Sequence, residues 1–428
     1  MRYNKWQILV SLCCVTMVLS SCVRNMFDQQ RYEEIVEDQS PVIDVDSNHD
    51  WMLSTSQILM VDISGLEDIE RIQVFSGNPA ESSTALVVGE AYVSEKSVVS
   101  MSITYPSTQK LLYAAAIDDE DLYTVAPFDP SASDVVNFSH PVASKKKMPY
   151  IYQPQVYTYL YEEEFPDPGD YDYNDIILRA SMERSAEREV RINVQLAAVG
   201  GVKQMAAALR LVGYRFDDIE SVKTVDDASF DVVGGVELPD QMRMFIKEKD
   251  LLLKGLINDA VINLFADGHW ATGDNISTDY GIVNRKRYNV SYENNDTYGR
   301  FIPRELTYIV TFKESVDVNY LSQIALDPFV ILEYNGGKWE LHTYNYNSAQ
   351  VLYPHPELDS KNLPWVFCIP NSTFLWPLHA VAIGYQAKSK RVTYGAYPYL
   401  GQSFGEWAAD RKKCYDWYLY PDNSQVYK

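Results

Sequence analysis

The sequence has little positive charge and few histidines for its 428 residues. Lys and Arg number 37 against 59 Asp and Glu, which gives a formal net charge of -22, and there are 6 histidines. Binding nucleic acid takes clustered Lys and Arg against the phosphates, so we expect no nucleic acid partner. The negative charge favours solubility and the binding of cations, and it does not bear on the fold.

The common signatures of enzymes are also missing. The sequence contains no HExxH zinc motif, no P-loop and no GxGxxG nucleotide fingerprint. Residues 401–405 match the nucleophile-elbow pattern around Ser403, but an α/β-hydrolase needs its histidine after the serine, and the last histidine is His379. We therefore expect a protein that is not an enzyme. A pair of glycosidase carboxylates stays open as an alternative, because their separation is spatial and does not show in the sequence.

Long apolar runs are confined to the N-terminus. Arg2 and Lys5 precede the apolar residues 8–19, a run that is shorter than the roughly 20 residues needed to span a bilayer. The run ends in Leu-Ser-Ser-Cys at residues 19–22, the processing pattern of bacterial lipoproteins. This predicts a signal peptide over residues 1–21, a lipid on Cys22 that anchors the protein to a membrane, and a polar tether over residues 22–43. No later apolar segment is long enough to cross a bilayer, so we expect the rest of the chain to lie outside the membrane.

Cysteine is scarce, with 5 in the chain. Cys13 and Cys14 would leave with the signal peptide and Cys22 would carry the lipid. Cys368 and Cys414 remain. Outside the cytoplasm these two could form a disulfide or stay as separate buried thiols, and the sequence leaves both alternatives open because it does not give the distance between them.

Residues 44–143 carry the pattern of a small β-sandwich. Short segments rich in β-forming residues alternate with turn signals every 8–12 residues, as is typical of sandwich domains. The strand candidates are residues 71–75, 85–88, 98–105 and 111–117. A lysine-rich stretch, residues 144–147, breaks the pattern and is interpreted as the linker to a second domain.

Residues 148–428 also favour a β-sandwich. Apolar and polar residues alternate strictly over residues 176–183 and 190–196, which predicts an antiparallel hairpin with one face on a core. Further strand candidates are residues 306–312, 329–333 and 392–397, and one helix is expected over residues 240–252. The predicted fold is thus mainly β, with two jelly-roll-like β-sandwich domains behind a lipidated tether and few short helices.

An acidic loop, residues 162–175, stands directly before this hairpin. Oxygen ligands at alternate positions of a loop are what Ca²⁺ requires, and Asp170, Asp172 and Asn174 have the spacing of the first three EF-hand ligands. Asp175 stands where an EF-hand has glycine, and Ser181 stands where it has glutamate, so the loop is not an EF-hand. We expect a calcium site at these four loop residues, with a solvated acidic turn as the alternative. Additional candidate ligands are Glu164 and Asp167 in the same loop, and Asp44, Asp46 and Asn48 in a weaker copy that is chiefly interpreted as a turn.

The loop motif Gly-Asp-Tyr-Asp-Tyr-Asn-Asp-Ile-Ile at residues 169–177 resembles that of the LruC-domain lipoproteins, exported proteins of Gram-negative bacteria largely without known function. Three tryptophan motifs are similar too, at residues 48–51, 362–365 and 406–422. Relatives commonly carry Trp-Pro where this chain has Phe165-Pro166. The resemblance implies a β-sandwich and a place in the cell envelope, at the outer membrane, and it supplies no activity.

Tyrosine is abundant, with 32 residues against 15 phenylalanines. Tyrosine lines half-exposed strands, and it is also favoured at recognition surfaces. Our leading hypothesis is a non-catalytic lipoprotein, an adhesion, structural or binding module at the cell surface stabilised by Ca²⁺. The alternatives are a glycan-binding accessory lipoprotein and a glycan hydrolase. The sequence leaves open whether the partner is a glycan or a protein, which side of the membrane the chain faces, and the oligomeric state.

Overall fold

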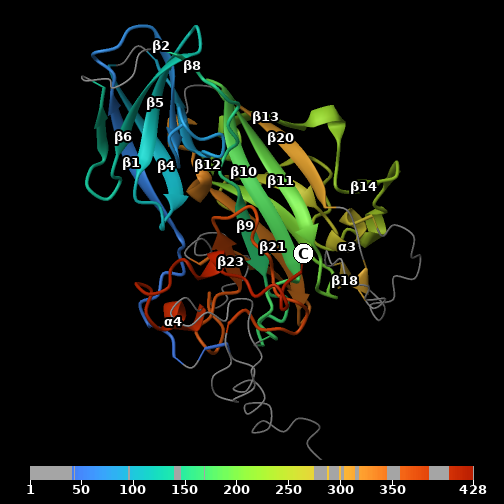
Figure 1. Ribbon diagram of the computed structural model, residues 1–428. Helices are drawn as coiled ribbons and strands as arrows, with labels where there is room; N and C mark the ends of the chain where they lie inside the picture. Colours follow the sequence, from blue (N-terminus) through green and yellow to red (C-terminus); the bar gives the residue numbers. More distant parts are fainter. Residues whose placement is uncertain are drawn as a thin grey trace, which may run out of the picture.

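A computed structural model shows two β-sheet bodies joined end to side (Figure 1). The structure describes residues 41–42, 44–94, 97–138, 146–167, 169–273, 287–288, 298–299, 303–313, 318–344, 357–384 and 404–427. The predicted signal peptide, Cys22, nearly all of the tether, the candidate strand 392–397 and Ser403 lie outside these residues. Within them the mainly β, sandwich-like fold class is confirmed.

The N-terminal body packs a three-stranded sheet, in the order β4-β1-β7, against a five-stranded sheet, in the order β3-β2-β5-β6-β8. Its strands are β1 (Ser54–Asp62), β2 (Ile69–Phe75), β3 (Val87–Tyr92), β4 (Val98–Pro106), β5 (Leu112–Asp118), β6 (Leu122–Phe128), β7 (Val135–Asn137) and β8 (Lys146–Lys147). Leu59, Ile72, Met101 and Ala114 are fully buried between the two sheets. The strands predicted at residues 71–75, 98–105 and 111–117 match β2, β4 and β5.

The C-terminal body packs a six-stranded sheet, in the order β13-β20-β11-β10-β9-β23, against a five-stranded sheet, in the order β16-β17-β12-β21-β22. The first sheet contains β9 (Tyr157–Tyr161), β10 (Ile176–Ala186), β11 (Glu189–Ala198), β13 (Ile219–Thr224), β20 (Arg304–Phe312) and β23 (Val366–Ile369). The second contains β12 (Ala206–Arg215), β16 (Leu252–Lys254), β17 (Asp259–Phe265), β21 (Leu326–Tyr334) and β22 (Gly337–Leu341). The remaining short strands are β14 (Val232–Val233), β15 (Val236–Glu237), β18 (Arg287–Tyr288) and β19 (Tyr298–Gly299).

The predicted hairpin is β10 and β11. Leu178 pairs with Leu196, and Ala180 pairs with Val194, in an antiparallel register. The apolar residues of both strands point into the core between the two sheets, where Ile192 is fully buried, while the neighbouring Arg191 is exposed. Alternation with a period of two, which the sequence displays, is what an antiparallel sheet with one buried face requires. The hairpin prediction is confirmed.

Helical structure is short throughout the described residues. The α-helices are α3 (Gly268–Ala271) and α4 (Phe404–Ala409), and the 3-10 turns are η1 (Phe216–Asp218), η2 (Val225–Asp227), η3 (Asp240–Met242), η4 (Val318–Tyr320), η5 (Gln323–Ala325) and η6 (Trp417–Leu419). The helix predicted over residues 240–252 is wrong, because only η3 forms there. Phe245 and Ile246 instead pack, outside any helix or strand, on the outer face of the five-stranded sheet of the C-terminal body. Within the described residues, no helix combines the length and the apolar character that crossing a membrane would take.

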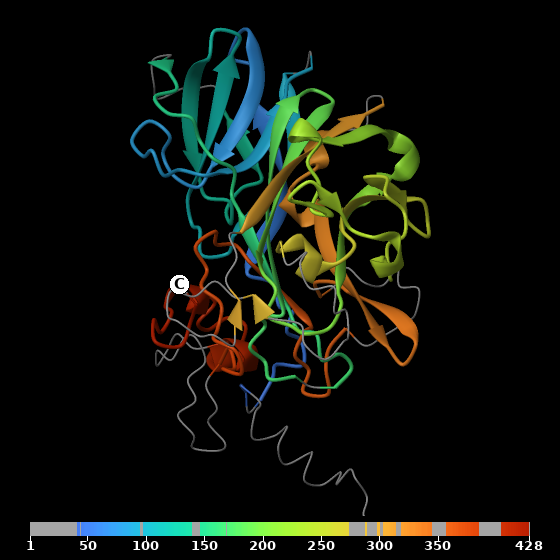
Figure 2. The same ribbon diagram turned by 90° about the vertical axis from the view of Figure 1, so that its right-hand side faces the viewer.

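The chain enters the N-terminal body only after contacting the C-terminal one. Trp51 and Leu53 belong to a buried cluster with Trp407, Trp417 and residues of the acidic loop. His49 Nε2 lies 2.9 Å from the backbone oxygen of Trp407. Residues 44–53 therefore lie with the C-terminal body, which differs from the predicted domain boundary at residue 44. The helix α4, which contributes Trp407 to this cluster, lies at the lower end of the molecule, away from most of the N-terminal body (Figures 1 and 2).

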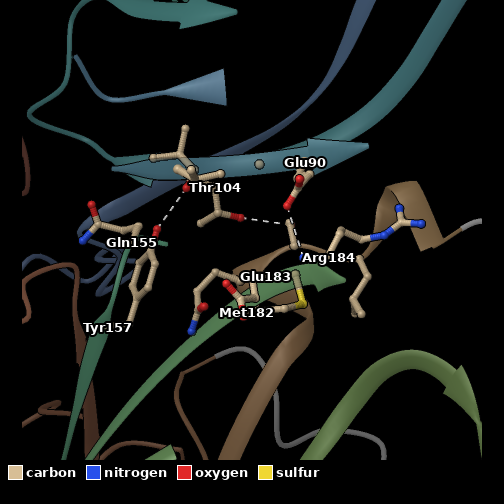
Figure 3. A pocket seen from close by; sticks show the side chains of 13 residues that line it. Glu90, Thr104, Gln155, Tyr157, Met182, Glu183 and Arg184 are labelled. Carbon is tan, nitrogen blue, oxygen red and sulfur yellow. Dashed lines mark hydrogen bonds between the residues drawn. The ribbon is translucent and has the colours of Figure 1, made fainter. Parts of the chain in front are cut away.

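Hydrogen bonds join the two bodies around a small cavity (Figure 3). Tyr157 Oη donates to the backbone oxygen of Thr104 at 3.0 Å, and the Arg184 backbone N–H donates to Glu90 Oε2 at 3.2 Å. The cavity measures about 30 Å³, which is enough for one water molecule. Burial raises the pKa of Glu90, and hydrogen bonds from Gln73 and the Arg184 backbone oppose that rise. The contacts are direct, so the two bodies are packed against each other and not merely tethered.

Candidate metal centre

The acidic loop, residues 162–175, connects the neighbouring strands β9 and β10. These strands are antiparallel, and Tyr161 pairs with Ile176 at the point where the loop leaves and returns. The Asp175 backbone N–H donates to the Tyr161 backbone oxygen at 3.3 Å. Because the two ends of the loop are paired in this way, Glu162 and Asp175 are brought face to face although they are the first and the last residue of the loop.

Three carboxylates meet at this closed end of the loop. Ligand oxygens of Glu162, Glu164 and Asp175 lie within 4.8 Å of one another. Glu162 is 2% exposed and Asp175 is 7% exposed. Glu162 Oε1 and Glu164 Oε2 are buried and have no hydrogen-bond partner among the described residues. A buried carboxylate oxygen without a partner is costly, so the arrangement calls for a proton or a cation.

The electrostatics of the group point the same way. Burial raises the pKa of Glu162 well above its ordinary value, and the Asp175 and Glu164 carboxylates raise it further. Burial, then Glu163 and Glu164, likewise raise the pKa of Asp175. Both effects disfavour the ionised forms, because like charges in a poorly solvated site repel each other. A divalent cation would reverse this balance and stabilise the carboxylates together.

Glu163, between two members of this group, has a separate structural role. Its carboxylate accepts hydrogen bonds from the backbone N–H groups of Val202 and Lys203, each at 2.8 Å. Burial and the Glu164 carboxylate raise the pKa of Glu163 to about 7, although these two N–H groups lower it. A Cβ at Gly201 would lie 2.4 Å from Glu163 Oε2, so glycine is needed for this close approach. Glu163 thus fixes the acidic loop to the segment that follows β11.

The donor set of Glu162, Glu164 and Asp175 fits a hard cation. All three ligands are carboxylates, and Ca²⁺ takes six to eight oxygen ligands, whereas Zn²⁺ and Cu²⁺ favour nitrogen and sulfur. Gly169 packs directly against this group, because a Cβ there would lie 2.3 Å from Glu162 Oε1. These residues could therefore hold Ca²⁺ in a site closed by the backbone of its own loop.

A second group combines Asp170, Asp172 and His379. His379 Nδ1 lies 3.4 Å from Asp172 Oδ2 and 3.9 Å from Asp170 Oδ2. Asp172 is already bonded, since it accepts from the backbone N–H groups of Asn174 at 3.0 Å and Ala380 at 2.8 Å. Burial raises the pKa of Asp172, and these bonds together with His379 oppose the rise. The second group is thus satisfied by the protein itself and orders the loop against residues 379–380.

Aromatic residues of the loop anchor it to the body. Tyr171 and Tyr173 are buried in left-handed backbone conformations, with φ of 60° and 50°. Tyr171 Oη donates to Asp359 Oδ2 at 3.0 Å, and Tyr173 Oη donates to the Pro364 backbone oxygen at 2.8 Å. Phe165 packs edge-on against Trp365, with ring centroids 5.0 Å apart. The acidic motif and the tryptophan motif at residues 362–365 therefore meet in space.

The structure divides the predicted ligands into separate places. Asp175 and the additional candidate Glu164 lie in the three-carboxylate group, whereas Asp170 and Asp172 lie in the group with His379. Asn174 is buried and donates from Nδ2 to the Pro377 backbone oxygen at 3.0 Å. Asp167 is exposed. The alternating residues 170, 172 and 174 thus do not form one ligand set, because Asp170 and Asp172 meet at His379 whereas the Asn174 side chain bonds to Pro377.

Of the other predicted site residues, Asp44 and Asn48 are exposed, and Asp46 Oδ1 accepts from the Asn48 backbone N–H at 2.9 Å. This is a turn, and none of these three residues belongs to a metal-ligand group within the part of the chain that the structure describes. Cys368 and Cys414 form no disulfide with each other and are both partly buried, and Cys414 Sγ donates to Glu406 Oε2 at 3.0 Å.

Two residues of these groups were missed from the sequence. Glu162 was part of the acidic run, but its role depends on β9, a strand whose five residues are all buried and therefore show no alternation. His379 lies far along the chain, and no local pattern distinguishes it from the other histidines. An acid at each end of a loop between two paired strands is the signal that could have identified Glu162.

Comparison with known proteins gives one family and one solved structure. A family model described as Domain of unknown function (DUF4842) matches residues 188–418. No curated protein matches the chain. A solved structure titled "Crystal structure of a Putative lipoprotein from Bacteroides ovatus at 2.08 A resolution" is similar at 13% identity and a TM-score of 0.48, covering 85% of this chain and 100% of that chain. The family match begins at residue 188, so the acidic loop at residues 162–175 lies outside the matched region.

Proposed function

We infer that this chain, which belongs to the DUF4842 family, is a lipid-anchored, non-catalytic binding or structural module of the bacterial envelope. In this proposal Ca²⁺ binds at the acidic loop and stabilises the C-terminal body. The anchor rests on the sequence at residues 1–22, where a short apolar run between Arg2 and Cys22 ends in a lipoprotein processing pattern. We place the protein at the outer membrane, on either its surface or its periplasmic side.

The resemblance to LruC-domain lipoproteins belongs to this proposal. Its motifs are far apart in the sequence, yet Trp51, Trp407 and Trp417 share one buried cluster with the loop residues Tyr171 and Tyr173. Their convergence supports the interpretation that the motifs form one structural unit around the acidic loop.

One observation carries the calcium proposal. Glu162 Oε1 is buried and has no hydrogen-bond partner in the part of the chain that the structure describes, and it lies beside the carboxylates of Glu164 and Asp175. A proton could satisfy one of these oxygens, but a cation satisfies all three carboxylates at once and brings no repulsion with it. Extracellular modules bind Ca²⁺ with dissociation constants around 10⁻⁴–10⁻³ M, which suits a protein outside the cytoplasm.

The role of Ca²⁺ in this proposal is structural. The three carboxylates hold the ends of β9 and β10, and the loop between them contacts the segments at residues 359–365 and 379–380. A bound cation would therefore fix both neighbouring segments through one loop. Segments that are fixed in this way suit a display or adhesion module, because such a module has to stay folded outside the cell.

Calorimetric titration with Ca²⁺ tests the site. We expect about one ion per chain for the wild type and no measurable heat of specific binding for Glu162→Gln, which keeps the side-chain volume and removes the charge. Asp167→Asn removes one charge from an exposed residue of the same loop and should bind as the wild type does. Equal binding by Glu162→Gln and the wild type would show that the ion, if bound, lies elsewhere.

The anchor is tested separately. Cys22→Ala removes the only thiol that can accept the lipid at the processing site, so the variant should move from the membrane fraction to the soluble fraction. Partition of the variant into detergent exactly as the wild type does would overturn the lipoprotein assignment while leaving the calcium site untouched.

A glycan-binding function is the second candidate. It is favoured by a half-open cavity on the outer face of β10, β11 and β20, which is lined by amide, hydroxyl and charged side chains together with apolar ones.

A further inference from the structure

The outer face of the six-stranded sheet carries two cross-strand rows of hydrogen-bonding side chains. Arg179 of β10 pairs with Gln195 of β11, and Gln195 pairs with Glu305 of β20. Arg179 Nη1 donates to Gln195 Oε1 at 3.1 Å, and Gln195 Nε2 donates to Glu305 Oε2 at 3.1 Å. The side chains of this row therefore orient one another and are held on a rigid sheet.

The second row lies two residues further along the strands. Ser181 of β10 pairs with Asn193 of β11, and Asn193 pairs with Thr307 of β20. Thr307 Oγ1 donates to Asn193 Oδ1 at 2.6 Å. This bond leaves the amide nitrogen of Asn193 as a donor, so the row offers both donors and acceptors.

The two rows line one side of a cavity. This cavity of about 410 Å³ is bounded by the sheet on one side and by Gln153, Pro154 and Leu86 on the other. The segment that carries Gln153 is fixed there, because the Val87 backbone N–H donates to the Gln153 backbone oxygen at 2.9 Å. Pockets of about 300–1,000 Å³ are the usual size for small organic ligands. The cavity is thus formed by both bodies together and is large enough for one or more sugar rings.

The next row along the strands differs in composition from the two rows inside the cavity. This row holds two opposite charges, because it pairs the partly exposed Glu183, which lines the small cavity between the two bodies, with the exposed Arg191. Inside the cavity the guanidinium of Arg179 is bonded, within the described residues, to neutral oxygens of Gln195 and Phe374. Its central carbon lies over the ring of Trp376, 5.5 Å from the ring centroid. Because Arg179 has no carboxylate partner among the described residues, its guanidinium can donate to a ligand oxygen.

We propose that this cavity binds a neutral oligosaccharide, whose hydroxyl groups bond to Ser181, Asn193, Gln195 and Arg179. A hydroxyl both donates and accepts, which matches rows that present amides, hydroxyls and a guanidinium side by side. A polyanion is disfavoured by the net charge of -22 and by Glu305 in the lining. The inference rests on the proposed function as a binding module, and it gives that module a glycan as its partner.

Native gel electrophoresis of the full-length chain, purified in detergent, tests the proposal. The gels contain one neutral polysaccharide each, from a panel of glucans, mannans, xylans, galactans, arabinans and fructans, and one gel contains polygalacturonate as the anionic comparison. At least one neutral polysaccharide should retard the wild type. Asn193→Ala and Gln195→Ala should each weaken that retardation by about fivefold, as expected for the loss of one or two hydrogen bonds.

Arg191→Ala is the matched control, because it changes the same face of the same strand one row outside the cavity. It should bind as the wild type does. Asn193→Ser keeps a hydroxyl next to Thr307 and provides a second variant if the alanine form does not fold. Absence of retardation by every neutral polysaccharide would overturn the proposal, as would equal retardation of the cavity variants and the wild type, or retardation by polygalacturonate alone.

The gels, together with melting curves recorded with Ca²⁺ and with chelator, separate this inference from the proposed function. A chain that binds polysaccharide but shows no calcium effect on its melting curve would overturn the calcium site and keep the cavity. A chain with a calcium effect and no retardation would overturn the cavity and keep the calcium site.

Discussion

At the scale of single residues, two glycines determine how close the acidic loop lies to its neighbours. Gly169 lies against Glu162 and Gly201 lies against Glu163, each with no room for a Cβ. In both cases the atom that a Cβ would meet belongs to a buried carboxylate whose position matters for the loop. Glycine is therefore needed here for its small size, independently of its backbone freedom.

This packing predicts the effect of Gly169→Ala. The added methyl would meet Glu162 Oε1 at 2.3 Å and push the carboxylate away from Glu164 and Asp175. We expect the affinity for Ca²⁺, measured by calorimetric titration, to fall about tenfold or more, which corresponds to a loss of roughly 1.4 kcal/mol in binding free energy. Gly77→Ala is the control, because its Cβ would make an ordinary contact of 3.5 Å with Ala85. Unchanged affinity in Gly169→Ala would show that Glu162 does not bind the ion.

The residue scale also shows how much of the site could be predicted. Glu164 and Asp175 were recognisable as acids in a loop before a strand. Glu162 was not, because its partnership with Asp175 is created by the pairing of β9 with β10. His379 could not be predicted, since its contact with Asp172 depends on how the C-terminal segments fold back over the loop.

At the scale of elements, strand pairing places a buried charge network in the second sheet of the C-terminal body. Arg210 of β12 pairs with Asp327 of β21, and their side chains form an ion pair of 2.9 Å. His342, directly after β22, lies 2.8 Å from Asp327 and 3.2 Å from Glu340. Burial alone would lower the pKa of His342, but the Asp327 and Glu340 carboxylates outweigh it and raise the pKa to about 9.

A pH dependence of stability follows from this network. The pKa of His342 is higher in the fold than its ordinary value of 6.5, so the folded state holds the proton more tightly than the unfolded state. The stabilisation is fully present below pH 6.5 and is lost as the pH rises through about 9. We expect the free energy of unfolding, from urea melts, to fall by about 1–3 kcal/mol over this window. His342→Gln should show a flatter profile, and parallel profiles of the two proteins would contradict the assignment.

A strand could be predicted from the sequence where one of its faces is buried and the other is exposed. The alternation in β10 and β11 reports one buried and one open face, and it specifies both strands and their pairing. β9 is buried on both faces and carries no alternation, so the sequence did not reveal it. Residues 240–252 have apolar residues at helical spacing, but Phe245 and Ile246 are required to cover the outer face of the five-stranded sheet, and tertiary packing overrides the local preference.

At the scale of the whole molecule, the two bodies are joined by more than the lysine-rich linker. Ser102 Oγ lies 2.8 Å from Ser322 Oγ, and Asn319 Nδ2 donates to the Tyr92 backbone oxygen at 3.2 Å. Trp51, which precedes β1, is buried against the C-terminal body. The N-terminal fragment is therefore held at several places, and cutting the linker should not release it.

Limited trypsin digestion tests this arrangement. Lys146 and Lys147 are exposed in the two-residue strand β8, so we expect the first cut at residues 144–147. The two fragments should then elute together in gel filtration and separate only in denaturant. A first cut within residues 170–200, or immediate separation of the fragments, would contradict the packing of the two bodies.

We expect Ca²⁺ bound by Glu162, Glu164 and Asp175 to stabilise the whole chain. The direct measurement is the melting temperature of the wild type with millimolar Ca²⁺ and with chelator. Calcium at about ten times its dissociation constant adds roughly 1.4 kcal/mol, which corresponds to a rise of about 3 °C for a domain of this size. Glu162→Gln should melt at one temperature in both conditions, at or above that of the metal-free wild type, because it removes part of the repulsion. Identical melting curves of the wild type with calcium and with chelator would contradict the claim.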